Sequence, residues 1–180
     1  HVVRNSSGLE YMWNGDPAIW GKVSPALFPI VGMLKNNTYT YNGKEYTLGR
    51  HGFAREQEFQ VEDQSADQVT FLLTDNETTR EVYPFRFAFR IRYVLKGDQL
   101  AVSYIVENTD DKELLFSVGG HPAFKLPLEV GLSYEDYYLH FNKPETAGRY
   151  PLSPGGQIEL TPVPLLQNTQ ELPLQKSLFY

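Results

Sequence analysis

The clearest pattern in the sequence is an alternation over residues 85–95, in which large apolar residues recur at every second position. One face of this segment carries Phe85, Phe87, Phe89, Ile91 and Tyr93, and the other carries Arg86, Ala88, Arg90 and Arg92. A period of two is that of a half-buried β-strand. After a Lys96-Gly97-Asp98 turn, residues 99–108 alternate in the same way, which predicts a second strand.

Several further segments read as short strands separated by turns. Residues 37–48 predict a hairpin, because two alternating runs flank Asn42-Gly43, a strong two-residue turn. Further strands are predicted over 68–78, 114–124 and 134–141. Residues 24–34 contain two prolines and predict a buried loop or a short edge strand.

The region after residue 142 is rich in proline and glycine, which predicts a loop with one short strand near 158–160. No segment shows a helical period. Many short strands and turns favour an all-β sandwich or barrel, and no linker divides residues 1–180, so we expect a single domain.

Composition excludes several classes of function. The formal net charge is -6 without blocks of Lys or Arg, which argues against nucleic acid as a partner. The absence of cysteine excludes disulfides, thiol catalysis and cysteine zinc sites. The apolar runs are too short to cross a bilayer, so no membrane contact is predicted. Without a visible signal peptide we expect a cytoplasmic protein, and the oligomeric state is left open.

Two histidines have unusual neighbours, in "RHGF" and "GGHPAF". Glycines beside His51 and His121 let the backbone bend or approach a ligand closely, and Pro122 stiffens the exit from the second motif. Each imidazole would be presented where a strand ends, and imidazole suits general acid chemistry near neutral pH. The alternative for each is a structural histidine at a strand end. No metal site is predicted, because ligand spacing is absent.

Other candidates are an arginine and several aromatic rings. Arg55 either pairs with Glu56 or Glu58 at the surface or binds substrate on the His51 side. Sugars stack their C–H faces on aromatic rings, which makes candidates of Phe53, Phe124, Trp13 and Trp20. Core packing is the alternative role for each of these rings.

The stretches "LEYMWNGDPAIWG", "LFPIVGMLKNNTYTYNGKEYTLGRHGFAR" and "FSVGGHPAF" together resemble the aldose 1-epimerase (galactose mutarotase-like) family, in its bacterial mutarotase-related branch. The resemblance implies an antiparallel β-sandwich of the galactose mutarotase-like (supersandwich) type. It also implies interconversion of the α and β anomers of a free aldose by acid/base ring opening, with a sugar as substrate and no cofactor.

By motif, the resemblance makes His121 the general acid and His51 the histidine that hydrogen-bonds near the ring oxygen. Arg55, Phe53 and Phe124 would bind substrate. The family's general base, a glutamate near the C-terminus, has no match here. We therefore expect the chain to be an incomplete portion of the family domain, with the base beyond Tyr180.

A further departure from the family pattern concerns an arginine before the hairpin, which contacts the sugar in mutarotases proper and aligns with Met33. Methionine cannot donate those hydrogen bonds. Two alternatives therefore stay open. One is a hexose-6-phosphate epimerase, for which Arg50, Arg55 and Lys35 are the nearby cations. The other is a non-catalytic carbohydrate-binding or sensing protein.

Overall fold

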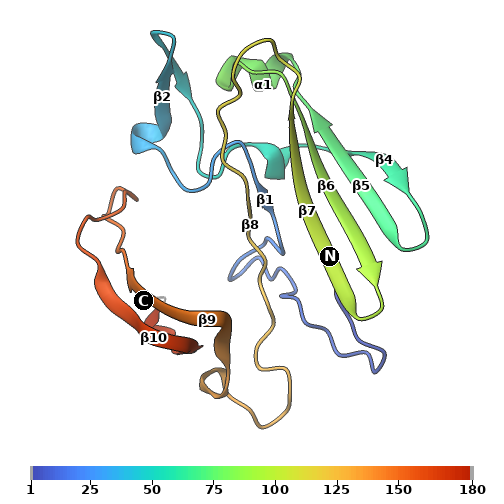
Figure 1. Cartoon of the computed structure of the whole chain (residues 1–180), viewed down its shortest axis with the longest axis vertical. Helices are drawn as coiled ribbons and strands as arrows, with labels where there is room; N and C mark the ends of the chain where they lie inside the picture. Colours follow the sequence, from blue (N-terminus) through green and yellow to red (C-terminus); the bar gives the residue numbers. More distant parts are fainter. Residues whose placement is uncertain (1, 179–180) are drawn as a thin grey trace. The chain divides into compact units, whose positions relative to one another are not determined.

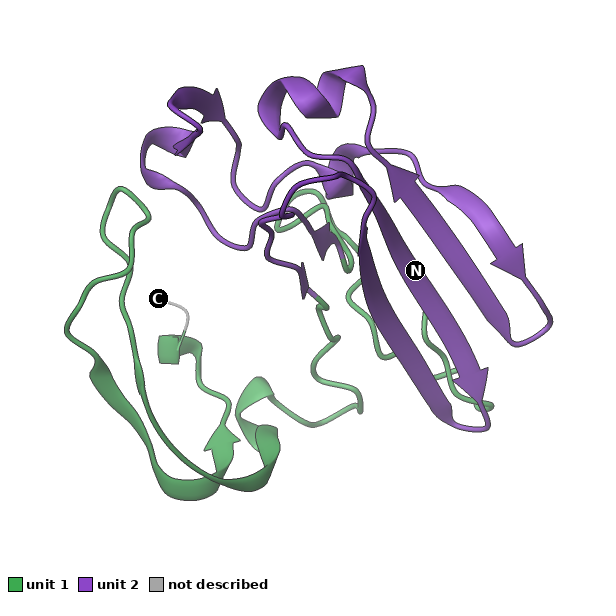
Figure 2. Ribbon diagram, turned by 45° about the horizontal axis from the view of Figure 1, so that its top comes forward, with its two compact units in different colours: residues 1–24, 122–180 green, residues 25–121 purple. Residues whose placement is uncertain are grey.

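The computed structural model describes residues 2–178, and most of its regular structure is β-strand. The chain forms two compact units, residues 25–121 (unit 2) and residues 1–24 with 122–180 (unit 1), as Figure 2 shows. The single domain predicted over residues 1–180 stays a prediction, and its first residue and last two lie outside the described residues.

The largest sheet of unit 2 is antiparallel and has four strands in the order β4-β5-β6-β7 (Figure 1). Their bounds are Gln60–Gln64, Gln68–Thr74, Phe87–Lys96 and Gln99–Asn108. The strands predicted over 68–78, 85–95 and 99–108 are thus confirmed, with ends displaced by a few residues. β4 was not predicted, since its sequence, QVEDQ, is polar apart from Val61 and shows no alternation, and all five residues are exposed.

The aromatic face of β6 forms the core of unit 2. Buried side chains cluster here: Phe28, Ala54, Leu73, Tyr83, Phe85, Phe87, Phe89 and Ile91. Phe28 has no exposed surface, and its ring centroid lies 4.7 Å from that of Phe89 and 5.0 Å from that of Phe87. The buried face predicted from the alternation is confirmed.

Two smaller strand pairs lie beside this core. β2 (Thr38–Tyr41) and β3 (Lys44–Thr47) form the predicted hairpin, and Asn42 and Gly43 both take positive φ, as this turn requires. β1 (Ala26–Leu27) pairs antiparallel with β8 (Gly119–Gly120). The strand predicted over 114–124 was wrong in extent. The Leu115 carbonyl instead accepts a hydrogen bond from the Tyr83 hydroxyl, and the backbone around Leu115 joins no strand ladder.

A short helix, α1 (Glu77–Val82), corrects the prediction that no segment is helical. Asn76 caps it: its side chain accepts from the Thr79 N–H at 2.9 Å, and the Thr79 hydroxyl accepts from the Asn76 N–H at 2.8 Å. The cap, rather than an amphipathic period, establishes a helix of six residues.

Unit 1 contains a long two-stranded ribbon, β9 (Tyr138–Arg149) with β10 (Val163–Pro173). The loop predicted after residue 142 was therefore wrong over β9 and β10 and held for residues 150–162 between them, and the strand near 158–160 was wrong. Ile158 forms only an isolated bridge with Leu152. Prolines in β9 and β10 misled the prediction. Each of these strands has one partner only, so a missing N–H can face away from the ladder.

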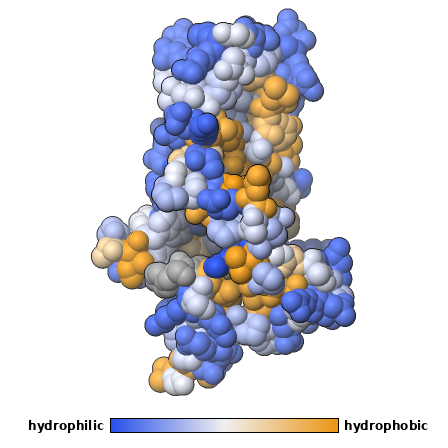
Figure 3. Space-filling model, turned by 90° about the vertical axis from the view of Figure 1, so that its left-hand side faces the viewer, coloured by the Kyte–Doolittle hydropathy of each residue, from blue (hydrophilic) through white to orange (hydrophobic). Residues whose placement is uncertain are grey.

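Part of the inner face of the unit 2 sheet is exposed. Strand β7 is the last of the sheet, and Leu95, Leu100 and Val102 keep about half of their surface exposed, at 53%, 43% and 41%. Apolar groups are visible on the molecular surface in Figure 3. Among residues 2–178, no helix has the length and apolar character needed to span a membrane.

Candidate active site

The segment that carries His51 is fixed by backbone hydrogen bonds to the chain at 28–32. The Phe28 carbonyl accepts from the N–H groups of Phe53 and Ala54, at 3.0 and 3.1 Å. Gly52 allows this approach, because a Cβ at that position would lie 2.3 Å from the Phe28 oxygen. His51 itself has φ of 67°, a conformation that costs free energy for a residue with a side chain. The loop is thus anchored on a fully buried residue.

The ring of His51 is oriented by the backbone of Gly32. The Gly32 N–H donates to His51 Nδ1 at 3.0 Å, and the His51 N–H donates to the Gly32 carbonyl at 2.7 Å. Because Nδ1 accepts, the neutral ring carries its proton on Nε2. The pKa of His51 is lowered by burial first, and then by the positive charges of Arg55, His121 and Arg50. These effects favour a neutral imidazole that donates through Nε2.

His121 follows β8 directly and is exposed. Its N–H donates to the Pro25 carbonyl at 3.1 Å, which continues the pairing of β8 with β1. The ring centroids of His51 and His121 lie 5.9 Å apart at an interplanar angle of 77°. The two imidazoles thus lie close together although 70 positions separate them in the sequence, whereas their catalytic roles stay predictions.

Two arginines lie close to His51. The Arg55 guanidinium donates to the Arg50 carbonyl at 3.0 Å, and its Nε lies 3.5 Å from a Glu56 carboxylate oxygen. That Nε is buried and has no hydrogen bond within residues 2–178. The Arg50 guanidinium lies 3.7 Å from Met33 Sδ, and no carboxylate is recorded beside it in the described part of the chain. Arg50 thus brings a cation to Met33.

Two of the four predicted stacking rings, Phe53 and Phe124, lie in different settings. Phe53 packs its ring edge-on against Phe28 and Tyr83, at centroid distances of 6.3 and 6.1 Å, which favours the core-packing alternative. Phe124 belongs to unit 1, where it pairs with Met12. A role for either ring in substrate binding stays a prediction.

Sequence reasoning missed two contributors to this site. Gly32 gave no signal, because its role depends on a backbone N–H rather than on a side chain. Tyr104, from β7, lies against Gly120: a Cβ on Gly120 would be 2.6 Å from the tyrosine hydroxyl oxygen. The double glycine before His121 was recognised, but the side chain that requires it was not.

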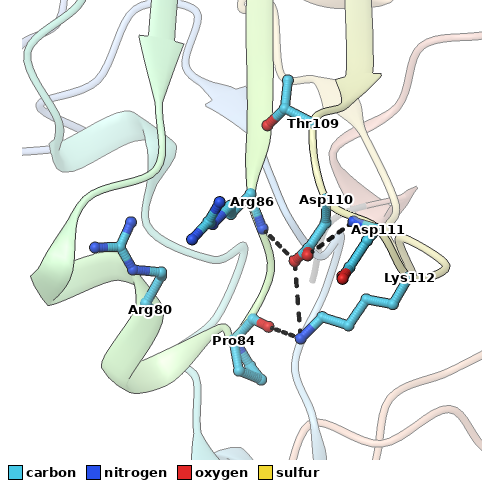
Figure 4. A pocket seen from close by; sticks show the side chains of 7 residues that line it. All are labelled: Arg80, Pro84, Arg86, Thr109, Asp110, Asp111 and Lys112. Carbon is cyan, nitrogen blue, oxygen red and sulfur yellow. Dashed lines mark hydrogen bonds and ion pairs between the residues drawn. The ribbon is translucent and has the colours of Figure 1, made fainter.

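A cavity of about 580 Å³ lies in unit 2 between α1 and the chain after β7 (Figure 4). Its charges are largely paired within the protein. Arg80 forms an ion pair with Asp75, and Lys112 donates to the Pro84 carbonyl and pairs with Asp110 at 3.7 Å. Such a network anchors a loop, so the cavity is a weaker candidate than the two histidines despite its size. Among residues 2–178, no group of three or more His, Asp or Glu side chains could hold a metal ion.

Comparison with known proteins identifies the class of protein that this fold and histidine pair define. The aldose 1-epimerase family model matches residues 1–151, and the chain belongs to that family. The chain is 36% identical over 185 residues to Protein LacX (plasmid) of Lactococcus lactis subsp. lactis, covering 98% of this chain. It spans 62% of the length of that relative.

Solved structures agree with this assignment. A galactose mutarotase related enzyme from Lactobacillus acidophilus is 42% identical, with a TM-score of 0.91, over 99% of this chain and 59% of that one. A galactose mutarotase-like protein from Lactobacillus casei is 34% identical, with a TM-score of 0.81, over 96% and 60% of the two chains. The predicted all-β, antiparallel fold of the galactose mutarotase-like type is thus confirmed.

Proposed function

We propose that the protein interconverts the α and β anomers of a free aldose by acid/base ring opening. Protonated His121 gives its proton to the ring oxygen while a base removes the proton of the anomeric hydroxyl. The bond between the anomeric carbon and the ring oxygen breaks, and the aldehyde rotates. Ring closure on the other face reverses both proton transfers, so the sugar loses and gains no atoms.

The observation that carries this proposal is the 5.9 Å separation of the two imidazoles, which come from distant parts of the sequence. Their environments differ, which suits different roles. His51 is held as a neutral donor by the Gly32 N–H, and it would stabilise the charge that develops at the ring oxygen. His121 is exposed and would be accessible to the sugar.

The general base in this proposal is a glutamate that follows Tyr180. This part of the proposal rests on the family resemblance. The chain spans 62% of the length of the LacX relative, so the activity is proposed for the complete protein.

Polarimetry tests the proposal on the complete protein. It should accelerate the change in optical rotation of fresh α-glucose or α-galactose. His121→Asn should lower the rate by about two to four orders of magnitude, the usual contribution of a general acid. His140→Asn is the matched control, because His140 is an exposed histidine on β9.

Rates equal to buffer for a broad panel of sugars would contradict the proposal. Sugar binding without catalysis, unchanged in His121→Asn, would favour the non-catalytic carbohydrate-binding protein instead.

The cations beside His51 favour a second candidate, an epimerase of a sugar phosphate. Arg50 has no recorded carboxylate partner in the described residues, and Arg55 has a buried Nε without a hydrogen bond. Guanidinium groups bind phosphate oxygens in pairs of hydrogen bonds. A substrate phosphate would pair with the Arg50 guanidinium, whereas Arg55 already lies beside the Glu56 carboxylate.

Competition by inorganic phosphate distinguishes the two candidates. If the substrate is a sugar phosphate, inorganic phosphate should compete with it for the site. Arg50→Gln should then raise the KM for a hexose 6-phosphate by roughly tenfold or more, because one charge-assisted hydrogen bond is lost. The KM for the unphosphorylated hexose should not change. Equal effects on both substrates would exclude a phosphate contact by Arg50.

A further inference from the structure

Unit 2 contains an apolar pocket that the proposed reaction does not use. The pocket has a volume of about 180 Å³ and lies between the β2–β3 hairpin, the chain at 30–34 and the segment that follows β7. All of its lining residues belong to unit 2, among them Ile30, Leu34, Tyr39, Tyr41, Tyr83 and Leu115. The pocket is thus formed within a single compact unit.

Aromatic rings of the unit 2 core form one side of this pocket. Tyr83 and Phe85 are buried, and their ring centroids lie 4.7 Å apart. The ring centroid of Tyr41 lies 4.8 Å from that of Phe85. Leu115, in contrast, leaves 52% of its surface exposed, so the pocket opens to solvent beside it. A ligand can therefore enter from solution and reach a buried aromatic surface.

The polar groups of the pocket indicate the chemistry of its occupant. The Tyr39 hydroxyl donates to the Val82 carbonyl and the Tyr83 hydroxyl to the Leu115 carbonyl, both at 2.8 Å. Burial, with a smaller effect of Tyr46, raises the pKa of Tyr39 to about 12, in accord with poor hydration here. Among the described residues that line the pocket, none carries a charge. A charged or polyhydroxylated ligand would lose more hydration than these groups could replace.

The size of the pocket limits the ligand to about one ring. An apolar protein cavity of about 150 Å³ holds one benzene molecule, and the pocket here has about 180 Å³. Aromatic rings at centroid distances of about 4.5–7 Å also stabilise one another beyond the area that they bury. A single six-membered ring therefore suits both the volume and the aromatic side of the pocket.

The pocket shares a wall with the segment that orients His51. Ile30 and Leu34 lie two residues to either side of Gly32, whose N–H donates to His51 Nδ1 at 3.0 Å. The two pocket side chains and this N–H belong to one short stretch of backbone. A molecule that packs against both side chains therefore acts on the backbone that holds the imidazole.

We propose that this pocket binds a small, uncharged apolar molecule with one six-membered ring, and that its occupancy alters the backbone at Gly32, which orients His51. The site is separate from the imidazoles, since neither His51 nor His121 lines it. Its ligand has no anomeric centre. The inference therefore stands independently of the proposed sugar chemistry.

An NMR titration with toluene tests the inference, both on the present chain and on the complete protein. The methyl resonances of Ile30, Leu34 and Leu115 should shift saturably, because the ring current of a bound aromatic molecule acts on neighbouring methyl groups. The apparent Kd should be roughly 1 mM or lower for a ligand of this size. The Gly32 amide resonance should shift with the same Kd.

Benzoate is the matched ligand control, because it has the same ring with a negative charge. It should bind at least about tenfold more weakly than toluene, since the pocket supplies no charged group to replace the hydration of the carboxylate.

Substitutions assign the shifts to the pocket. Leu115→Ala should weaken toluene binding about three- to tenfold, because it removes apolar surface that the ligand covers. Leu100→Ala is the matched control: Leu100 is likewise a partly exposed leucine of unit 2, at 43%, and it does not line this pocket. If Leu115→Ala does not fold, Leu34→Ala replaces it.

Three outcomes overturn the inference: methyl resonances that do not shift saturably, equal toluene affinities in Leu115→Ala and Leu100→Ala, or benzoate binding as tight as that of toluene. A Gly32 amide resonance that stays constant at saturation refutes the link to His51. Binding by the 180-residue chain but not by the complete protein also overturns the inference, because another part of that protein would then fill the pocket.

Discussion

At the scale of single residues, His51 shows how backbone groups determine the chemistry of a side chain. The Gly32 N–H occupies Nδ1, so protonation of that nitrogen would require the hydrogen bond to break. Burial and three neighbouring cationic or titratable groups lower the pKa further. The neutral form is therefore favoured down to pH values below the ordinary pKa of histidine, about 6.5.

This electrostatic argument predicts the effect of substitutions at Arg55, the largest charge contribution to the lowered pKa. Arg55→Gln should raise the pKa of His51, because it removes a positive charge that disfavours the imidazolium. Arg55→Lys should keep the pKa low. The measurement is an NMR titration of the His51 ring protons.

Arg92→Gln is the control for this titration, since Arg92 contacts Gln68 on the sheet and is not among the groups that shift His51. The pH dependence of catalysis should shift in the same direction as the pKa of His51. If neutral His51 is required, the acid limb of the pH–rate profile should move to higher pH in Arg55→Gln. An unchanged His51 pKa in that variant would refute the electrostatic argument.

At the scale of elements, the position of His121 depends on how β8 packs. Tyr104 reaches from β7 to Gly120, and Gly119 meets Val31, where a Cβ would lie 3.1 Å from a valine methyl carbon. A side chain at Gly120 would thus meet Tyr104 too closely, and one at Gly119 would press on Val31, both from distant parts of the sequence. The "GGH" motif indicated a special backbone, but the identity of the neighbours required coordinates.

A pair of substitutions tests this packing. Gly120→Ala should place its methyl group about 2.6 Å from the Tyr104 hydroxyl oxygen and displace β8. We expect kcat to fall about 10- to 100-fold, the effect of misplacing a reacting group by a fraction of an ångström to an ångström. Tyr104→Phe should restore most of the loss, because the nearest ring atoms lie at an ordinary 3.4 Å.

Gly49→Ala is the control for this pair, since a Cβ there would meet nothing within 4 Å. Steady-state kinetics and thermal unfolding together separate a displaced His121 from a general loss of stability. Failure of Tyr104→Phe to improve Gly120→Ala would contradict the proposed contact.

The elements also show what sequence patterns can and cannot predict. Strands β5, β6 and β7 and the β2–β3 hairpin were predictable, because alternation and turn residues are local signals. Helix α1 was missed because six residues carry too little periodicity. Strand β10 was missed because Pro164 and Pro173 argue against a strand. Proline breaks a strand only where both of its edges need ladder hydrogen bonds, and β10 has a partner on one edge. The histidine pair was predictable only through the family resemblance, since nothing local relates residue 51 to residue 121.

At the scale of the whole molecule, Phe28 links stability to the site in unit 2. Its side chain is fully enclosed in the aromatic core, as are those of Phe87 and Phe89, and its carbonyl accepts hydrogen bonds from two N–H groups of the His51 loop. The core and the loop therefore depend on one residue.

Phe28→Ala should lower the free energy of unfolding by about 3–5 kcal/mol, the usual cost of removing a buried phenylalanine. Denaturant unfolding measures this cost. Val61→Ala, at an exposed position, should change stability by less than about 0.5 kcal/mol. A small effect of Phe28→Ala would mean that the ring is less tightly enclosed than its lack of exposed surface indicates.

The terminal position of β7 has a consequence for handling the chain in solution. Its outer backbone amides and carbonyls have no ladder partner within the described sheet, and apolar side chains stand on the adjoining face. Such a border is a template onto which a strand of another molecule can add. Concentrated samples of these 180 residues should accordingly associate through that border and precipitate.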